Sequence, residues 1–415
     1  MTNFVKLRYI LFYSIFLLAE NPVFSQNPEI GESLPLWSEG YLDIHNINTG
    51  KGESSFLILP DGTTMLVDAG VTTAVKPRVT DSKPSGKRTP GEWIARYIKH
   101  FTQDMTDSKL DYVIVTHFHE DHIGGITPGT SIAKDGDYKL TGISEVGEII
   151  PFIKIIDRGW PDYDWPVPPA GESAKNYIQF VKWQVARRKM LAEKFCVGAN
   201  DQIVLINNAK RYPDFEIRNI AANGHIWTGV GSVERNYFPD IQNLPKEKYP
   251  NENMCSIAFR LSYGKFDYFN GGDIYSVTNE PWQDIESPVG RVTGPVEVCK
   301  ANHHANFDAM GKSFLESLRP RVIIIQNWLA QQPDMSVLRR MLSTKTYPGP
   351  RDIFTTNIME ETKVVVGWAV DRLKGDQGHV IIRVNPGGND FMVYVLDDSN
   401  ENFQIKAKFG PYVCD

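Results

Sequence analysis

The stretch that decides the fold is Thr116-His117-Phe118-His119-Glu120-Asp121-His122-Ile123-Gly124-Gly125, in which three histidines and Asp121 fall within six consecutive positions. His117 and His119 are two residues apart, so in an extended segment their side chains lie on the same side and can reach one metal ion. Asp121 and His122 follow where the chain can turn into a helix and face a second metal ion. The two glycines that close the stretch permit a tight turn of the backbone.

This mixture of imidazole and carboxylate is ligand chemistry that zinc accepts, with Mn or Fe as alternatives. A solvated polar loop would explain a single histidine here. It would not explain three histidines and an aspartate between a buried strand at 113–115 and a double-glycine turn. The stretch therefore predicts a centre for two divalent metal ions.

Segments before the motif indicate a sheet followed by a helix. Thr89 can cap a helix, Pro90 suits its first turn, and Glu92 completes a capping box. Strand-rich and helix-bearing stretches alternate in two halves, roughly 41–200 and 201–380, which favours two sheets packed face to face with helices outside. We therefore expect an α/β fold, a four-layer αββα sandwich, with early strands at 41–44, 55–59 and 64–67.

The N-terminus has the pattern of a signal peptide over residues 1–25. Lys6 and Arg8 precede an apolar stretch at 9–19, and Val23-Phe24-Ser25 offers a cleavage site. This predicts an exported protein, periplasmic or extracellular, that has no membrane contact after cleavage. An uncleaved anchor is the alternative. We expect an N-terminal segment at 26–40, the main α/β domain at 41–400 with an insertion at about 128–200, and a C-terminal tail at 401–415.

Composition narrows the function classes. The formal net charge of −6 gives no overall indication of a nucleic-acid coat or a membrane-surface protein. The four cysteines lack the close spacing of a structural zinc site, and we expect them to be mostly buried small residues, with a disulfide as the alternative. Nothing in the sequence specifies an oligomeric state.

The motif H-x-H-x-D-H resembles the signature of the metallo-β-lactamase superfamily. Further motifs follow in the order of that family, and they cover most of residues 41–330. These motifs are Asp68-Ala69-Gly70, Asn223-Gly224-His225, Asn270-Gly271-Gly272-Asp273 and Ala301-Asn302-His303-His304.

The resemblance implies a role for each residue at a motif position. His117, His119 and His225 would hold the first metal ion. Asp121, His122 and His303 would hold the second, and Asp273 would bridge the two. His303 is expected as the ligand in preference to His304, because the first histidine of such a pair takes this role in related sequences. Asp121 would also act in catalysis, and His304 is the candidate general acid.

A narrower resemblance concerns the substrate. The segment 50–54, the segment 253–263 and the His303-His304 pair are similar to the hydrolase domain of ComEC-type competence proteins and to phosphorylcholine esterases. Asp273 stands where β-lactamases of this fold use a cysteine or leave the position non-bridging, which disfavours β-lactam hydrolysis. The resemblance implies a phosphodiesterase or nuclease-like enzyme acting on a small-molecule or polymeric ester, nucleic acid included.

Two alternatives remain open. One is a lactonase or other carbonyl-ester hydrolase of the same fold, and the other is a non-catalytic metal-binding member. The aromatic loop at 160–166 could stack on a base or clasp a cation, or it could simply pack its aromatic side chains on the core.

Overall fold

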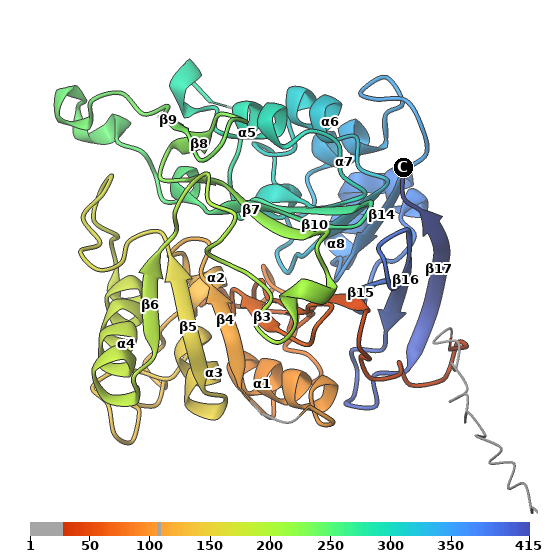
Figure 1. Ribbon diagram of the computed structural model, residues 1–415, viewed down its shortest axis with the longest axis horizontal. Coiled ribbons are helices and arrows are strands. Elements are labelled where there is room, and N and C mark those ends of the chain that lie inside the picture. The colour runs from red at the N-terminus through yellow and green to blue at the C-terminus, as the bar shows by residue number, and fades with distance from the viewer. Residues whose placement is uncertain (1–27, 106–108, 277) are drawn as a thin grey trace, which may run out of the picture.

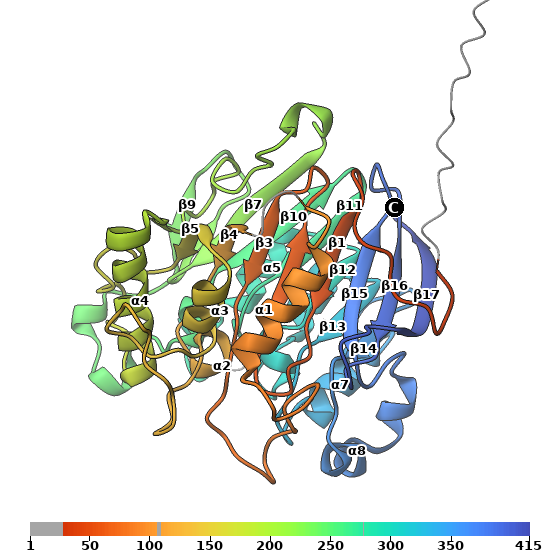
Figure 2. The same cartoon turned by 90° about the horizontal axis from the view of Figure 1, so that it is seen from below.

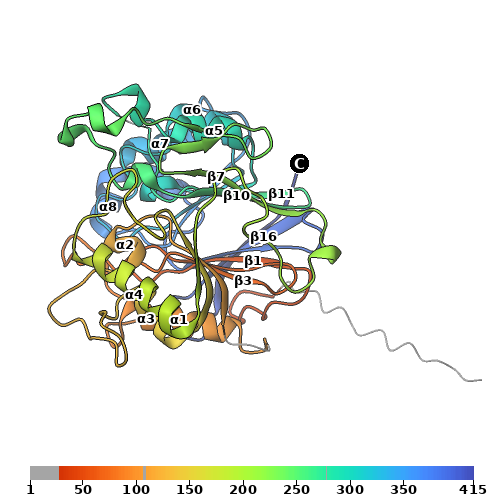
Figure 3. The same cartoon turned by 60° about the vertical axis from the view of Figure 1, so that its left-hand side comes forward.

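Two large sheets pack face to face between two layers of helices in the computed structural model (Figures 1 and 3). The structure describes residues 28–105, 109–276 and 278–415, so the expected signal peptide at 1–25 lies outside the described residues. The four layers match the αββα architecture expected from the alternation of strands and helices.

The first sheet has nine strands in the order β17-β16-β15-β1-β2-β3-β4-β5-β6. Pairing is antiparallel from β17 to β3 and parallel from β3 to β6. Its strands are β1 (Leu42–Asn46), β2 (Ser55–Ile58), β3 (Thr64–Val67), β4 (Leu110–Ile114), β5 (Phe152–Asp157), β6 (Leu191–Lys194), β15 (His379–Val384), β16 (Asp390–Leu396) and β17 (Ile405–Val413).

The second sheet has eight strands in the order β14-β13-β12-β11-β10-β7-β8-β9. Strands β11 to β14 pair in parallel, and the others pair antiparallel. Its strands are β7 (Phe215–Ala222), β8 (His225–Trp227), β9 (Glu234–Asn236), β10 (Ala258–Tyr263), β11 (Phe266–Asn270), β12 (Val298–Lys300), β13 (Val322–Ile325) and β14 (Asp352–Thr355).

Helices cover the outer face of each sheet. Figure 2 shows α1 (Pro90–Phe101), α3 (Ile143–Ile149) and α4 (Glu172–Arg188) in front of the first sheet. The second sheet is covered by α5 (Glu286–Thr293), α6 (Lys312–Leu318) and α7 (Met335–Leu342), while α2 (Glu120–Ile123) and α8 (Glu360–Val366) are short. Three apolar cores result, one under each helix layer and one between the sheets.

Burial on both faces explains why the central strands are apolar without alternation. Every residue of β2 and β3 is buried, because one face of the sheet packs on helices and the other on the second sheet. The helix α1 begins as expected. Thr89 caps it, the reciprocal contact with Glu92 is present, and Pro90 occupies the first turn.

Two segments differ from their expected character. The stretch from about 128 to 200 contributes α3, β5, α4 and β6, and the two strands extend the parallel half of the first sheet. Residues 401–415, expected as a tail, hold the edge strand β17. The lysines and the Gly-Pro pair within β17 are typical of an edge strand. They interrupt the alternation of apolar and polar residues by which a strand is predicted from sequence.

The four cysteines lie in the described part of the chain and are free. Cys196 is exposed, and the other three are buried. In the aromatic loop, Tyr163 is buried and donates its hydroxyl to Asp157 at 2.8 Å, while Trp165 remains 38% exposed. No helix within the described ranges is long and apolar enough to cross a membrane.

Candidate metal centre

The histidine motif lies at one edge of the sandwich, where parallel strands of both sheets end. Strand β4 leads into the motif, and α2 begins within it at Glu120. From the second sheet, Asp273 follows β11, and the His303-His304 pair follows β12. Because the carboxyl ends of parallel strands meet at a common edge, loops distant in sequence converge there.

One group of candidate ligands consists of His117, His119 and Asp273, whose ligand atoms all lie within 4.8 Å of one another. The Nε2 atom of His117 is 3.1 Å from Nδ1 of His119 and 3.6 Å from Oδ2 of Asp273. His117 is buried, whereas His119 is exposed at the mouth of the site.

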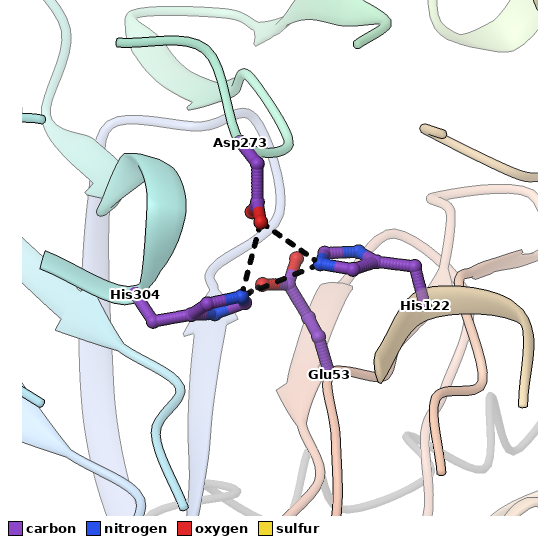
Figure 4. A group of neighbouring side chains, drawn as sticks. All are labelled: Glu53, His122, Asp273 and His304. Atoms are coloured by element: carbon purple, nitrogen blue, oxygen red, sulfur yellow. Dashed lines mark hydrogen bonds and ion pairs between the residues drawn. The ribbon is translucent and has the colours of Figure 1, made fainter. Parts of the chain in front are cut away.

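A second group forms around His122 and His304 (Figure 4). Their Nε2 atoms are 3.3 Å apart and lie 3.3 and 3.2 Å from Oδ2 of Asp273. The Oδ2 atom of Asp121 is 3.6 Å from Nε2 of His304. Asp273 is therefore common to both groups.

This arrangement fits bound divalent metal ions. Imidazole nitrogens of His117, His122 and His304 converge on one carboxylate oxygen. The other oxygen of that carboxylate, Oδ1 of Asp273, is buried and has no hydrogen-bond partner among the residues that the structure describes. Buried polar atoms rarely lack a partner. A cation held by these imidazole nitrogens and carboxylate oxygens would be the missing partner of Oδ1.

Two carboxylates orient the ligand histidines of the second group. Asp68 accepts hydrogen bonds from Nδ1 of His122 at 2.8 Å and from the backbone N–H of Thr116 at 2.8 Å. Oε2 of Glu53 lies 3.2 Å from Nδ1 of His304. A carboxylate on one ring nitrogen directs the other nitrogen towards a metal ion and makes it more basic.

Glu53 is itself held by a buried lysine. The Nζ atom of Lys300 donates to both Glu53 oxygens, at 2.7 and 2.9 Å, and to the carbonyl of Gly272 at 3.2 Å. Burial opposes ionisation of Glu53, but the charge of Lys300 and the hydrogen bond from His304 lower its pKa. We therefore regard Glu53 as the group that positions His304, although its oxygens lie close enough to ligate.

The turn that carries the histidine pair has an unusual backbone. His303, His304 and Ala305 all have positive φ values of 42°, 53° and 56°. A non-glycine residue in this region costs about 1 kcal/mol or more, so the surrounding contacts must hold the turn in place. Neighbouring side chains in such a turn point in different directions.

The electrostatics of the site favour the ligand forms of Asp121 and His117. They do not favour those of His122 and His304: burial opposes protonation of these two rings, but the charge of Asp273 raises the pKa of each well above its usual range, so a bound cation would have to displace a proton from each. Burial opposes ionisation of Asp121, but the hydrogen bond from His304 and the charge of His122 lower its pKa to about 2, so it is a carboxylate at neutral pH. Burial lowers the pKa of His117 well below its usual range, and the neighbouring charge of His122 adds to this effect. Metal ligands must be ionised carboxylates or neutral imidazoles.

The structure brings together six of the residues expected at the site, namely His117, His119, Asp121, His122, Asp273 and His304. The assignment of His225 as a ligand stays a prediction. That residue opens β8, is outside both ligand groups, and its Nδ1 lies 2.9 Å from Oε1 of Glu234. Glu234 lies on the neighbouring strand β9 opposite Trp227, and its diagonal contact with His225 could not be anticipated from a motif.

The histidine pair does not lie as expected. His304, not His303, lies in the second ligand group. Nδ1 of His303 lies 2.7 Å from Oδ1 of Asp308, and its Nε2 is 4.0 Å from Oδ2 of Asp273 and 3.2 Å from Nδ2 of Asn253. The left-handed turn decides which ring faces the ligands, and sequence alone does not reveal that turn.

Four polar residues were missed as parts of the site: Glu53, Asp68, Lys300 and Asp308. Signals for the first two were present, since Glu53 follows a Gly-Lys-Gly turn and Asp68 ends a strand two residues before Gly70. A Cβ atom on Gly70 would lie only 1.6 Å from the carbonyl oxygen of Asp121. The glycine is therefore required for the close approach of the two loops.

Part of the chain matches a known family. Residues 48–139 match the metallo-β-lactamase superfamily. The match contains Glu53, Asp68 and the whole histidine motif, and with the four-layer architecture it confirms the fold class expected from the sequence. The narrower likeness to ComEC-type proteins and phosphorylcholine esterases stays a prediction.

No curated protein matches the chain. Among solved structures, human tRNase Z, short form (ELAC1), is similar over 68% of this chain and 91% of that chain, with 10% identity and a TM-score of 0.30. That likeness is too weak to carry a conclusion about fold or function.

Proposed function

We propose that the protein is a metal-dependent hydrolase that uses two divalent metal ions and acts on phosphodiesters. The observation that carries this proposal is the position of Asp273, whose carboxylate is shared by two groups of candidate ligands. A shared carboxylate holds two cations close together, as two-metal hydrolases require.

In this proposal, His117, His119 and Asp273 would hold the first ion. His122, His304 and Asp273 would hold the second, and Asp121 lies 3.6 Å from His304. Zinc fits the nitrogen-rich donor set, and Mn or Fe are the alternatives. When bound, such ions activate water as a nucleophile and offset negative charge on the substrate.

The chain itself supplies proton transfer and orientation. Asp121 is ionised and 24% exposed at its side chain, so it can accept a hydrogen bond from the attacking water and then its proton. His303 lies on the other side of Asp273 with its Nδ1 against Asp308. Once protonated, His303 would exchange the contact of its Nε2 with Nδ2 of Asn253 for one with the departing alkoxide or phenoxide, and would protonate that group.

A phosphodiester suits this division of roles. Its leaving group is a poor one unless it is protonated, and His303 is 17% exposed at its side chain and so within reach of substrate. A lactone or other carbonyl ester is the alternative substrate class. We also propose, from the N-terminal pattern alone, that the protein is exported.

The test is hydrolysis of bis(p-nitrophenyl) phosphate by protein loaded with zinc or manganese. We expect turnover that falls at least about 100-fold in Asp121→Asn and in His304→Gln. His225→Gln is the matched control, because this histidine lies outside both ligand groups and its loss should leave turnover within about twofold.

His303→Gln separates the proposed proton donor from the ligands. Metal content should stay at the wild-type level, and turnover should fall most for esters with poorly acidic leaving groups. If the metal-loaded protein hydrolyses lactones but no phosphodiester, the carbonyl-ester alternative is correct.

A further inference from the structure

A cavity of about 240 Å³ opens beside the exposed ligand His119. Most of its wall is apolar. Phe118 comes from the histidine motif, Val167, Pro168 and Pro169 come from the loop after β5, and Pro250 comes from the segment before β10. Because His119 is part of the wall, a group in this cavity would lie directly beside the candidate metal centre.

The two charged residues in the wall neutralise each other. Arg158 donates to Glu252 through Nε at 2.7 Å and through Nη2 at 2.6 Å. Its remaining nitrogen, Nη1, donates to the carbonyl of Trp165 and to Oδ1 of Asn223, both at 3.2 Å. Arg158 is 1% exposed, so its guanidinium is fully engaged and unavailable to a phosphate group.

The other polar groups in the wall are also engaged. Glu252 accepts the backbone N–H of Phe118 at 2.9 Å. Asn251 donates to the hydroxyl of Tyr275 at 2.8 Å and accepts the backbone N–H of Met254 at 3.2 Å. Within this wall the cavity therefore presents apolar surface to a ligand, and no spare cation.

We propose that this cavity binds a flat, uncharged ring, such as a nucleobase or another aromatic group, carried by one ester arm of the substrate. The inference rests on the proposed function and deepens it by naming the substrate class. Proline and valine side chains offer a ring an apolar surface, with the buried Phe118 behind them, and the position of the cavity places that ring next to the phosphate. A second phosphate would find no partner there, so a polyanionic chain cannot continue through this side of the site.

Binding of small phosphonates tests the inference without depending on turnover. Calorimetric titration of the metal-loaded protein should give phenylphosphonate an affinity at least about tenfold higher than methylphosphonate, because ring burial adds to the same metal-directed group. Thymidine 5′-monophosphate tests whether a nucleobase is preferred over a simple phenyl ring.

The variant Ala170→Phe would fill the cavity. Ala170 is exposed and forms part of the wall, so the larger side chain should not disturb the core. We expect it to remove the preference for phenylphosphonate and to leave methylphosphonate binding within about twofold. Ala209→Phe, at an exposed alanine outside the site, is the matched control and should keep the preference.

Equal affinities for the two phosphonates, or a preference that persists in Ala170→Phe, would overturn the inference. Turnover of bis(p-nitrophenyl) phosphate is measured on the same samples. Turnover without a preference for the ring-bearing phosphonate would reject only the assignment of the cavity. A preference for that phosphonate without turnover of any phosphodiester would reject the proposed reaction, although the cavity would still bind a ring.

Discussion

Replacing Glu53 by glutamine should destabilise the protein strongly. Both Glu53 and Lys300 have side chains no more than 1% exposed, and Nζ of Lys300 contacts both carboxylate oxygens within 2.9 Å. In Glu53→Gln the buried ammonium keeps the carbonyl of Gly272, at 3.2 Å, and one amide oxygen at position 53, but it loses the negative charge that now compensates it and faces an amide NH2 in place of the second oxygen. Removing one partner of such a pair costs about 3–5 kcal/mol, because the remaining charge is uncompensated.

The loss is measured as the free energy of unfolding in guanidinium chloride, with chelator present so that metal binding does not contribute. The double variant Glu53→Gln with Lys300→Met should recover most of the loss, since it removes both charges. Lys312→Met is the control. Its ion pair with Glu316 is exposed, and its loss should cost less than about 0.5 kcal/mol.

The argument would be refuted if Glu53→Gln cost less than about 1 kcal/mol, or if the double variant were no more stable than the single one. Either result would mean that the pair contributes little or that the ammonium finds another partner. If the slope of the unfolding free energy against denaturant concentration is the same in every variant as in the wild type, the same folded state is being compared.

Three further predictions concern the metal ligands, a loop contact and pH. His304→Ala should reduce the bound metal from two ions to one per chain by elemental analysis, whereas His303→Ala should leave two; the opposite result would restore the roles expected from sequence. Gly70→Ala should abolish metal binding and cost at least about 3 kcal/mol in denaturant unfolding, because its Cβ would clash with Asp121; an unaltered metal content would contradict this. Burial raises the pKa of Glu145 to about 7, above its ordinary 4.5, so the folded state holds this proton more tightly than the unfolded state does. The resulting stability is complete below pH 4.5 and is lost as the pH rises through 7, so Glu145→Gln should stabilise the protein by up to about 3 kcal/mol at pH 8 and have little effect at pH 4.5; an equal effect at both values would exclude this titration.

The fold class could be predicted from sequence because its signals are local. The capping box at Thr89 and the strand that delivers the histidine motif depend on residues close together in the chain. The edge strand β17 could not be predicted in the same way. Its pairing with β16 supplies the stability that its lysines and its Gly-Pro pair do not indicate.

The sequence predicts which side chains gather at the site, except where an unusual backbone conformation decides which of two neighbouring side chains faces it. A dense motif such as His117 to His122 limits the geometry enough to predict which side chains lie together as candidate ligands. The choice between His303 and His304 depends on three consecutive residues at positive φ, for which neither histidine nor alanine is a signal. The Glu53–Lys300 pair joins residues 247 positions apart, and only the packing of the two sheets brings them together.

The candidate ligands come from both sheets, and this has a consequence for how the proposed reaction could be tuned. His117, His119 and His122 follow a strand of the nine-stranded sheet, whereas Asp273 and His304 follow strands of the eight-stranded sheet. The gap between the sheets is set by the side chains that fill it, among them Leu57 and Phe259. The volume of the side chains between the sheets therefore sets the distance between the candidate ligands of one sheet and those of the other. A change of one or two methylene groups far from the site could alter reactivity while every candidate ligand stays the same.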